Sequence, residues 1–260
     1  MKNHLTDKLD AGMQRVAAQA RSWAALSLLA LSLGLPRAGY AQATLPAGFS
    51  ETRIRGISSP TAMCLVPDGR VFVCSQGGAV RVVKNDALLA TPLINLNVSA
   101  LEERGLDGVQ VDPDFANNGF VYLYYAALTP APHNRLSRFT VVGDTANPNT
   151  EVILFDLPNL SQSGWHNGGC IQFGPDGKLY FSAGENNIPA NAQSLNTTLG
   201  KILRINSDGS IPADNPFYKR VLRKGRTRTA KSLANLQISL FPLLCVEQTF
   251  ANGRLSKPTW

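Results

Sequence analysis

The sequence has few of the residues that mark metal-binding, disulfide-rich or membrane-spanning proteins. Its 260 residues include four cysteines and three histidines, with no Cys-x-x-Cys pair and no Cys/His spacing of the kind that holds zinc. The longest apolar run, Trp23 to Leu35, has 13 residues, whereas a bilayer-spanning helix needs about 20. We therefore expect no metal site made of clustered Cys and His ligands, and no conventional transmembrane helix.

Acidic residues are missing between Ala11 and Ser50. Within this region basic residues precede the apolar run, Pro36 ends it, and Ala41-Gln42-Ala43 forms a small-x-small cleavage site. The pattern predicts a signal helix within a signal peptide over residues 1–43, although a buried N-terminal helix is the alternative. We expect a secreted or periplasmic (extracytoplasmic) protein that keeps no stable membrane anchor after cleavage.

Acidic residues are also scarce at the other end. Residues 218–260 hold nine Lys or Arg and one acid, Glu247, whereas residues 44–217 hold 11 basic and 15 acidic residues. The net charge of +7 therefore comes from the two ends, and the mildly acidic middle argues against a nucleic-acid partner. Residues 218–260 lack strand alternation, so we expect an unstructured or frameshifted tail; a basic tail for anionic surfaces is the alternative.

Residues 44–217 have the pattern of an all-β domain in which a hairpin-like unit is repeated. Strand-like segments flank three Pro-Asp turns, at Pro67, Pro113 and Pro175, and these stand 46 and 62 residues apart. A propeller blade of four short strands needs about 40–50 residues, whereas the strands of a β-sandwich recur every 8–12 residues without a longer echo. We therefore predict a partial β-propeller of about three blades over 44–217.

One stretch, Gly164 to Asn187, carries the strongest candidate for chemistry. His166 stands in a glycine-rich segment, and the hairpin that follows turns at Gly174 to Gly177 and ends at Glu185. A hairpin returns its end to its beginning, so Glu185 should lie near His166 as a proton-handling pair. The alternative is that His166 is a polar residue at a strand start and Glu185 a solvated charge.

Cys64 and Cys74 flank the first Pro-Asp turn. Facing positions across a hairpin would allow a disulfide in an exported protein, and two small buried apolar side chains are the equal alternative. Cys170 and Cys245 have no obvious partner.

Taken in order, several segments resemble the glucose/sorbosone dehydrogenase family, the soluble quinoprotein sugar dehydrogenases. The resemblance covers about residues 45–217. Its segments are Leu45 to Phe49, the Pro67-Asp68-Gly69-Arg70 hairpin, Glu103-Arg104-Gly105-Leu106 with Gly108, Asp112 to Phe115, His133 to Phe139, His166-Asn167-Gly168-Gly169, Leu199 to Asn206, Asp208 to Pro212, and Asp214 to Phe217.

This resemblance implies a six-bladed β-propeller that holds pyrroloquinoline quinone and calcium near its axis. In such enzymes a histidine takes the proton from the anomeric hydroxyl of an aldose while hydride passes to the quinone, and His166 matches that histidine. Glu185 falls where the family has an orienting aspartate. Glu103 lies where the family has a glutamine or acid near the quinone. Glu103 and Asn186 are the candidate cofactor-binding residues.

The chain departs from the family beyond Phe217, where the segment with a quinone-binding arginine and the calcium ligands would follow. We therefore expect the quinone and calcium not to be retained, and the sugar-oxidising activity to be impaired or absent. Asp107, where the family often has an apolar residue, is a lesser departure. The alternatives are a non-catalytic extracellular propeller that binds a sugar or protein, and a calcium-dependent lactone hydrolase. Neither the particular sugar nor the oligomeric state follows from the sequence.

Overall fold

The structure is a computed structural model that describes residues 45–216 together with the backbone of Asn235 and Leu236. The chain divides into two units, Met1–Glu51 and Thr52–Trp260. The described part of the first unit contains a turn, in which the Phe49 amide donates to the Pro46 carbonyl at 3.2 Å. The expected signal peptide and almost all of the expected basic tail lie outside the described residues.

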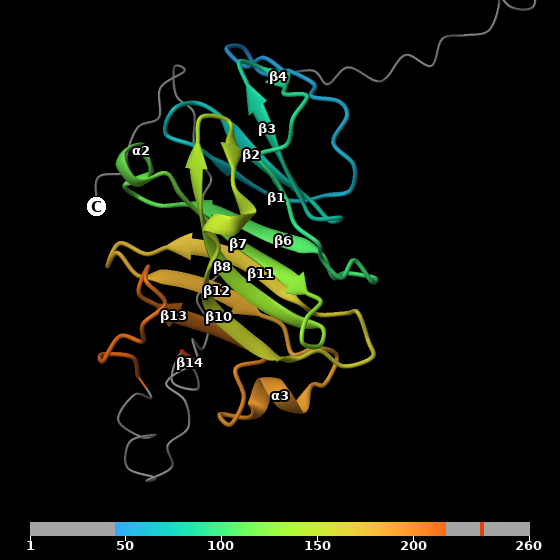
Figure 1. The fold of residues 1–260 in the computed structure, drawn as a ribbon, viewed down its shortest axis with the longest axis vertical. Helices are drawn as coiled ribbons and strands as arrows, with labels where there is room; N and C mark the ends of the chain where they lie inside the picture. The colour runs from blue at the N-terminus through green and yellow to red at the C-terminus, as the bar shows by residue number, and fades with distance from the viewer. Residues whose placement is uncertain (1–44, 217–234, 237–260) are drawn as a thin grey trace, which may run out of the picture. The chain divides into compact units, whose positions relative to one another are not determined.

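The described part of the second unit is almost entirely β-structure, arranged in three antiparallel sheets in chain order (Figure 1). Sheet 1 runs in the order β1 (Pro60–Leu65), β2 (Val71–Ser75), β3 (Ala79–Lys84) and β4 (Ala87–Leu88), with β5 (Ile94–Asn95) also on β3. The predicted turn at Pro67-Asp68-Gly69 joins β1 to β2, and the Gly69 amide closes it on the Val66 carbonyl at 2.9 Å.

Sheet 2 runs in the order β10 (Val152–Asn159), β8 (His133–Val142), β7 (Phe120–Ala127) and β6 (Leu106–Val111). The short helix α2 (Phe115–Asn118) links β6 to β7, β9 (Thr145–Ala146) pairs with β8, and the 3-10 turn η1 (Pro148–Thr150) precedes β10. The second Pro-Asp pair lies between β6 and α2, as the sequence predicts.

Sheet 3 consists of β11 (Gly168–Phe173), β12 (Leu179–Ala183), β13 (Lys201–Ile205) and β14 (Asn235–Leu236). The turn at Gly174 to Gly177 joins β11 to β12, and the short helix α3 (Ala190–Gln193) lies between β12 and β13. Leu179 and Phe181 are buried while Tyr180 lies on the other face, which confirms the predicted alternation along this strand.

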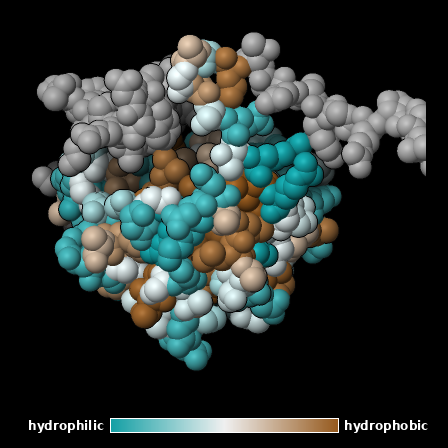
Figure 2. All heavy atoms as spheres, turned by 90° about the horizontal axis from the view of Figure 1, so that it is seen from above, coloured by the Kyte–Doolittle hydropathy of each residue, from teal (hydrophilic) through white to brown (hydrophobic). Residues whose placement is uncertain are grey.

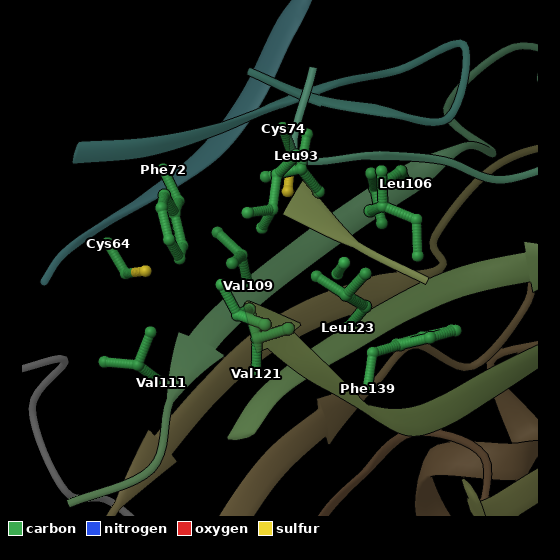
Figure 3. Close-up of a cluster of buried hydrophobic side chains, with 14 of the residues drawn as sticks. Cys64, Phe72, Cys74, Leu93, Leu106, Val109, Val111, Val121, Leu123 and Phe139 are labelled. Carbon is green, nitrogen blue, oxygen red and sulfur yellow. The ribbon is translucent and has the colours of Figure 1, made fainter. Parts of the chain in front are cut away.

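Two apolar clusters hold the sheets together. One lies between sheets 1 and 2 and the other between sheets 2 and 3, so sheet 2 contributes one face to each cluster. Figure 3 shows the first cluster, in which Phe72 and Cys74 of sheet 1 meet Val121 and Leu123 of sheet 2. Burial of such side chains contributes about 1.5–3 kcal/mol each, so these clusters account for the contact between successive sheets.

The first strands of sheets 2 and 3 approach each other closely, because Gly108 in β6 has no side chain. A Cβ at Gly108 would lie 2.0 Å from the Gly169 carbonyl oxygen of β11. This close approach brings the segment that carries His166 next to the segment that carries Glu103.

The two cysteines around the first turn are free thiols. In the β1–β2 register Cys64 stands opposite Phe72, while Cys74 lies nearer the start of β1, so their side chains do not face each other. Both are buried in the first apolar cluster, and burial raises the pKa of the Cys64 thiol to about 12. The alternative of two small buried apolar side chains is therefore the correct one, and the disulfide hypothesis is wrong for this pair. Cys245 lies outside the described residues.

Among residues 45–216, no helix is long and apolar enough to cross a membrane.

Candidate active site

The predicted His–Glu pair is present. His166 precedes β11 and Glu185 follows β12, and the hairpin between them returns Glu185 to His166, as the sequence predicts. The Nδ1 atom of His166 is hydrogen-bonded to Oε1 of Glu185. The His166 side chain is 51% exposed and that of Glu185 21%, so the imidazole remains open to a ligand.

Backbone hydrogen bonds close the loop around this pair. The Asn186 amide donates to the His166 carbonyl at 3.1 Å, and the Gly184 amide donates to the Asn167 carbonyl at 3.1 Å. A Cβ at Gly184 would lie 1.8 Å from the His166 carbonyl oxygen, so this approach requires glycine. The geometry of the pair therefore depends on the loop backbone as well as on the two side chains.

His166 and Asn186 both adopt left-handed backbone conformations, with φ values of +59° and +60°. Glu102 and Asn187 share this feature, at +56° and +55°. Such values are uncommon outside glycine and persist where surrounding contacts hold them, often at functional sites. Their concentration around His166 marks the loop as a site whose geometry is imposed by its surroundings.

The two remaining candidates lie on either side of His166. Oε2 of Glu103 accepts a hydrogen bond from the His166 backbone amide at 2.7 Å. Asn186 is 2% exposed, and its Oδ1 accepts from Ser161 Oγ at 3.3 Å. The structure thus brings all four predicted residues together, with Glu103 and Asn186 holding the backbone around His166.

Buried polar residues that the sequence analysis did not name as site residues hold the backbone of the loop in place. The Asn167 carbonyl accepts hydrogen bonds from Tyr124 Oη at 2.8 Å and from Asn134 Nδ2 at 3.2 Å, and all three residues are buried. The Asn167 side chain in turn donates to the Gly164 carbonyl at 2.6 Å. Tyr124 and Asn134 come from different strands of sheet 2, so only the fold shows that they converge on the residue after His166.

The charges around the pair set its proton affinity. The hydrogen bond to Glu185, together with the negative charges of Glu185 and Glu103, raises the pKa of His166 above its ordinary value of 6.5. Partial desolvation acts to raise the pKa of Glu185, but the hydrogen bond from His166 and backbone amides outweigh it and lower that pKa. Glu185 is therefore a carboxylate near neutral pH, where it can hold the imidazole in one orientation.

Asp107 adds an unusual carboxyl group beside the site. Burial, reinforced by the charge of Glu103, raises its pKa to about 7. Its Oδ2 is buried and has no hydrogen-bond partner among the described residues. Asp107 also packs against the segment after His166, since a Cβ at Gly169 would lie 2.8 Å from the Asp107 Cβ.

The residues present do not by themselves fit an anionic quinone and a calcium ion. Carboxylates surround His166, and the neighbouring cation Arg104 is buried, with its Nη2 bound to the carbonyls of Ser161 at 2.6 Å and Ser163 at 2.8 Å. Burial also lowers the pKa of Arg104. Residues 45–216 contain no group of three or more His, Cys, Asp or Glu side chains placed to hold a metal ion.

Comparison with known proteins defines the class. The profile described as glucose/sorbosone dehydrogenase matches residues 57–226, about two thirds of the chain. The chain belongs to the glucose/sorbosone dehydrogenase family, a family of sugar oxidoreductases.

Particular relatives agree with this assignment. The chain is 32% identical over 174 residues to aldose sugar dehydrogenase YliI of Escherichia coli, covering 63% of this chain and 45% of that protein. It is 27% identical over 200 residues to quinoprotein glucose dehydrogenase B of Acinetobacter calcoaceticus, covering 65% and 41%. It is also 26% identical over 197 residues to the Hedgehog-interacting protein of Homo sapiens, covering 64% and 28%.

A solved structure supports the fold. The PQQ-bound form of an aldose sugar dehydrogenase from Streptomyces coelicolor superposes with a TM-score of 0.57 at 30% identity, covering 64% of this chain and 50% of that one. The described fold is thus all-β and propeller-like, as in that family. The chain spans less than half the length of the curated relatives it matches.

Proposed function

We propose that this chain carries the proton-accepting part of a sugar-oxidising site, with His166 as the general base. The observation that supports this most directly is the hydrogen bond between His166 Nδ1 and Glu185. If Nδ1 donates its hydrogen to the carboxylate, the Nε2 lone pair is free to accept a proton from a sugar hydroxyl. The exposed imidazole leaves room for that hydroxyl.

Oxidation of an aldose at its anomeric carbon also needs an acceptor for the hydride that leaves as the hydroxyl proton is removed. Relatives named as quinoproteins point to pyrroloquinoline quinone for this role, with calcium in the family. The described residues do not fit such an anionic group, because carboxylates dominate the site and Arg104 is already bound to two carbonyls. We therefore propose that the parent activity is impaired or absent in this chain, and that it does not retain the cofactor.

Two measurements on the full chain test these statements. An aldose titration should shift the ring signals of His166 in NMR spectra and leave those of His133, which is buried in sheet 2, unchanged. With pyrroloquinoline quinone, calcium and glucose present, we expect no reduction of an artificial electron acceptor. A His166 signal indifferent to all aldoses contradicts the base assignment, whereas robust turnover contradicts the proposed impairment.

The wider architecture is part of the same proposal. We propose that residues 44–217 form about three blades of a six-bladed β-propeller, behind a signal peptide over 1–43 and ahead of a basic tail over 218–260, of which residues 218–226 still match the family profile. Export should place the mature chain outside the cytoplasm. Cell fractionation and N-terminal sequencing of the product test this, with Thr44 as the expected first residue.

A second candidate function is a non-catalytic extracellular module that binds a sugar or a protein. The similarity to the Hedgehog-interacting protein favours it, because that relative is named for an interaction and not for an enzymatic reaction. The NMR titration separates the two candidates. An aldose that shifts the His166 ring signals supports the base assignment, whereas binding of a sugar or protein that leaves them unchanged supports the binding module.

A further inference from the structure

Residues 185–200 form a loop that begins with Glu185 and closes on itself; we call this segment the carboxylate loop. The Gly200 amide donates to the Gly184 carbonyl at 2.9 Å, so the two ends of the loop meet. None of the residues from 187 to 197 is buried, and the short helix α3 within the loop buries no side chain. Apolar packing therefore does not fix the middle of the carboxylate loop.

A buried lysine, and not an apolar cluster, holds this loop together. Lys201 is the first residue of β13 and is 5% exposed. Its Nζ atom donates to three backbone carbonyls of the loop, those of Asn191 at 2.8 Å, Leu199 at 3.0 Å and Ala192 at 3.1 Å. An ammonium group has three donors, so these carbonyls satisfy all of them. Burial lowers the pKa of Lys201, and no carboxylate among residues 45–216 acts against this shift.

The contacts of Lys201 require the folded form of the loop. Burial of an ammonium group is unfavourable unless hydrogen bonds replace its lost hydration. Two of the carbonyls come from α3 and one from the residue before Gly200, so they meet at a single Nζ atom only when α3 lies against the start of β13. A Cβ at Gly200 would lie 2.7 Å from the Ala192 Cα, so this close approach also requires glycine.

Asn191 connects the buried cation to the active site. Its carbonyl accepts from Lys201 Nζ, while its side-chain Nδ2 donates to the Glu185 carbonyl at 3.0 Å. Oε1 of Glu185 is in turn hydrogen-bonded to Nδ1 of His166. A continuous series of hydrogen bonds and one side chain thus leads from the ammonium group to the imidazole.

We propose that Lys201 is a positioning residue for the His166–Glu185 pair, because it holds the carboxylate loop in the arrangement that presents Glu185 to the imidazole. Lys201 Nζ is bound to the loop carbonyls, so it acts on His166 through Asn191 and Glu185. The inference rests on the proposed function, since it concerns the orientation of the proposed base.

Two consequences of removing the Lys201 charge have opposite signs. Loss of a nearby positive charge by itself raises the pKa of His166, because the protonated imidazole then meets less repulsion. Withdrawal of Glu185 lowers that pKa, because the hydrogen bond and the charge of Glu185 hold it above 6.5. The sign of the change therefore separates positioning from a direct effect of charge.

An NMR titration of the His166 ring in the full chain carrying Lys201→Met tests the inference. Methionine is similar in length to lysine and has no charge. We expect the pKa of His166 to fall toward 6.5, by about half or more of the fall that Glu185→Gln produces. The ring signals of His133, which is buried in sheet 2, should stay unchanged and show that the variant is folded.

Lys84→Met is the matched control, because it removes the same charge from a lysine outside the site. Lys84 ends β3 and forms an ion pair with Asp144 at 2.9 Å, with a side chain that is 45% exposed. Within the second unit, β3 and α3 lie at opposite ends (Figure 1), and Figure 2 views the end that carries β3, where hydrophilic residues are numerous at the surface. We expect no fall in the His166 pKa in this variant.

Asn191→Leu provides a second test that leaves Lys201 in place. Leucine is close to asparagine in shape but cannot donate to the Glu185 carbonyl, so the connection to the pair is lost. The pKa of His166 should fall in this variant as well. If Lys201→Met does not yield folded protein, the titration of Asn191→Leu decides the inference.

An unchanged or raised His166 pKa in folded Lys201→Met would overturn the inference, and so would an equal fall in Lys84→Met or an unchanged pKa in Asn191→Leu. A loss of overall stability alone does not shift the pKa of a histidine in the folded protein. Because the pKa measurement needs no sugar, its outcome is separable from failure of the proposed function. A pKa that falls as expected in a chain whose His166 signals ignore aldoses would retain the positioning role and reject the base assignment. An aldose response with an unchanged pKa in Lys201→Met would do the reverse.

Discussion

At the residue scale, the His166–Glu185 pair is a hydrogen-bonded unit whose proton affinity depends on its negative neighbours. Glu185→Gln removes the carboxylate that contributes most to the raised pKa of His166, so that pKa should fall toward 6.5. The NMR titration of the His166 ring measures it directly. Because the base form exists only above the pKa, the variant should also bind protons at His166 over a lower pH range.

The matched control is Asp86→Asn, which removes one negative charge from an exposed turn of sheet 1. Asp86 has a φ of +59°, a conformation that asparagine tolerates well, so the substitution should not disturb the backbone. An equal fall in the His166 pKa in both variants would mean that net charge, and not the hydrogen bond, sets its proton affinity.

The raised pKa of Asp107 leads to a second prediction at this scale, which concerns the pH dependence of the free energy of unfolding. The ordinary pKa of an aspartate carboxyl is 3.8, whereas the pKa of Asp107 in the folded protein is about 7, so folding favours its neutral form. As pH rises from about 4 to about 7, the unfolded chain loses this proton before the folded chain does, and the free energy of unfolding falls. Above that range the loss is constant, with an upper bound of about 4 kcal/mol.

Asp107→Asn keeps the shape and removes the ionisation. Chemical denaturation should show the variant more stable than the wild type at pH 8 and nearly equal to it at pH 4, so the wild type at low pH is an internal control. Equal differences at both pH values would show that the carboxyl group does not titrate between them.

At the element scale, the hairpin of β11 and β12 was predictable because its turn residues and alternating apolar side chains lie next to each other in the sequence. The proximity of Glu185 to His166 followed from that hairpin alone. The contacts from Tyr124 and Asn134 to the Asn167 carbonyl could not be predicted in the same way, because they depend on how sheet 2 packs against sheet 3. The disulfide hypothesis failed for a related reason, since register decides which residues face each other and spacing around a turn does not.

Gly184 links this hairpin to the site and gives a prediction at the element scale. Gly184→Ala would place a Cβ 1.8 Å from the His166 carbonyl, so the two ends of the hairpin must separate. We expect a loss of about 1–3 kcal/mol in the free energy of unfolding and a fall in the His166 pKa, since the imidazole moves away from Glu185. Gly77→Ala is the control, because a Cβ at Gly77 meets nothing within 4 Å. Unchanged His166 titration in Gly184→Ala would mean that the loop adapts without moving the pair.

At the scale of the whole molecule, sheet 2 differs from sheets 1 and 3 because it contributes side chains to both apolar clusters. Stacked repeats that contact only their neighbours derive stability from each unit and from each interface, so sheets 1 and 3 should be able to open separately while sheet 2 is shared. The sequence predicted that strands recur around the three Pro-Asp turns. That Tyr180 occupies in sheet 3 the register position of Tyr122 in sheet 2, but is more exposed, became visible only when the register was known.

This arrangement predicts which region each core substitution will open. Phe181→Ala removes a ring that contacts Phe155 in the cluster of sheets 2 and 3, with centroids 5.6 Å apart, and should cost about 3–5 kcal/mol. Hydrogen exchange should then lose protection in β11 to β13 while β1 to β3 keep theirs. Phe72→Ala, which lies in the other cluster, is the reciprocal variant and should expose β1 to β3 first. If either substitution lowered protection equally in all three sheets, the described part of the second unit would unfold as one cooperative body, and the assignment of stability to separate interfaces between sheets would be wrong.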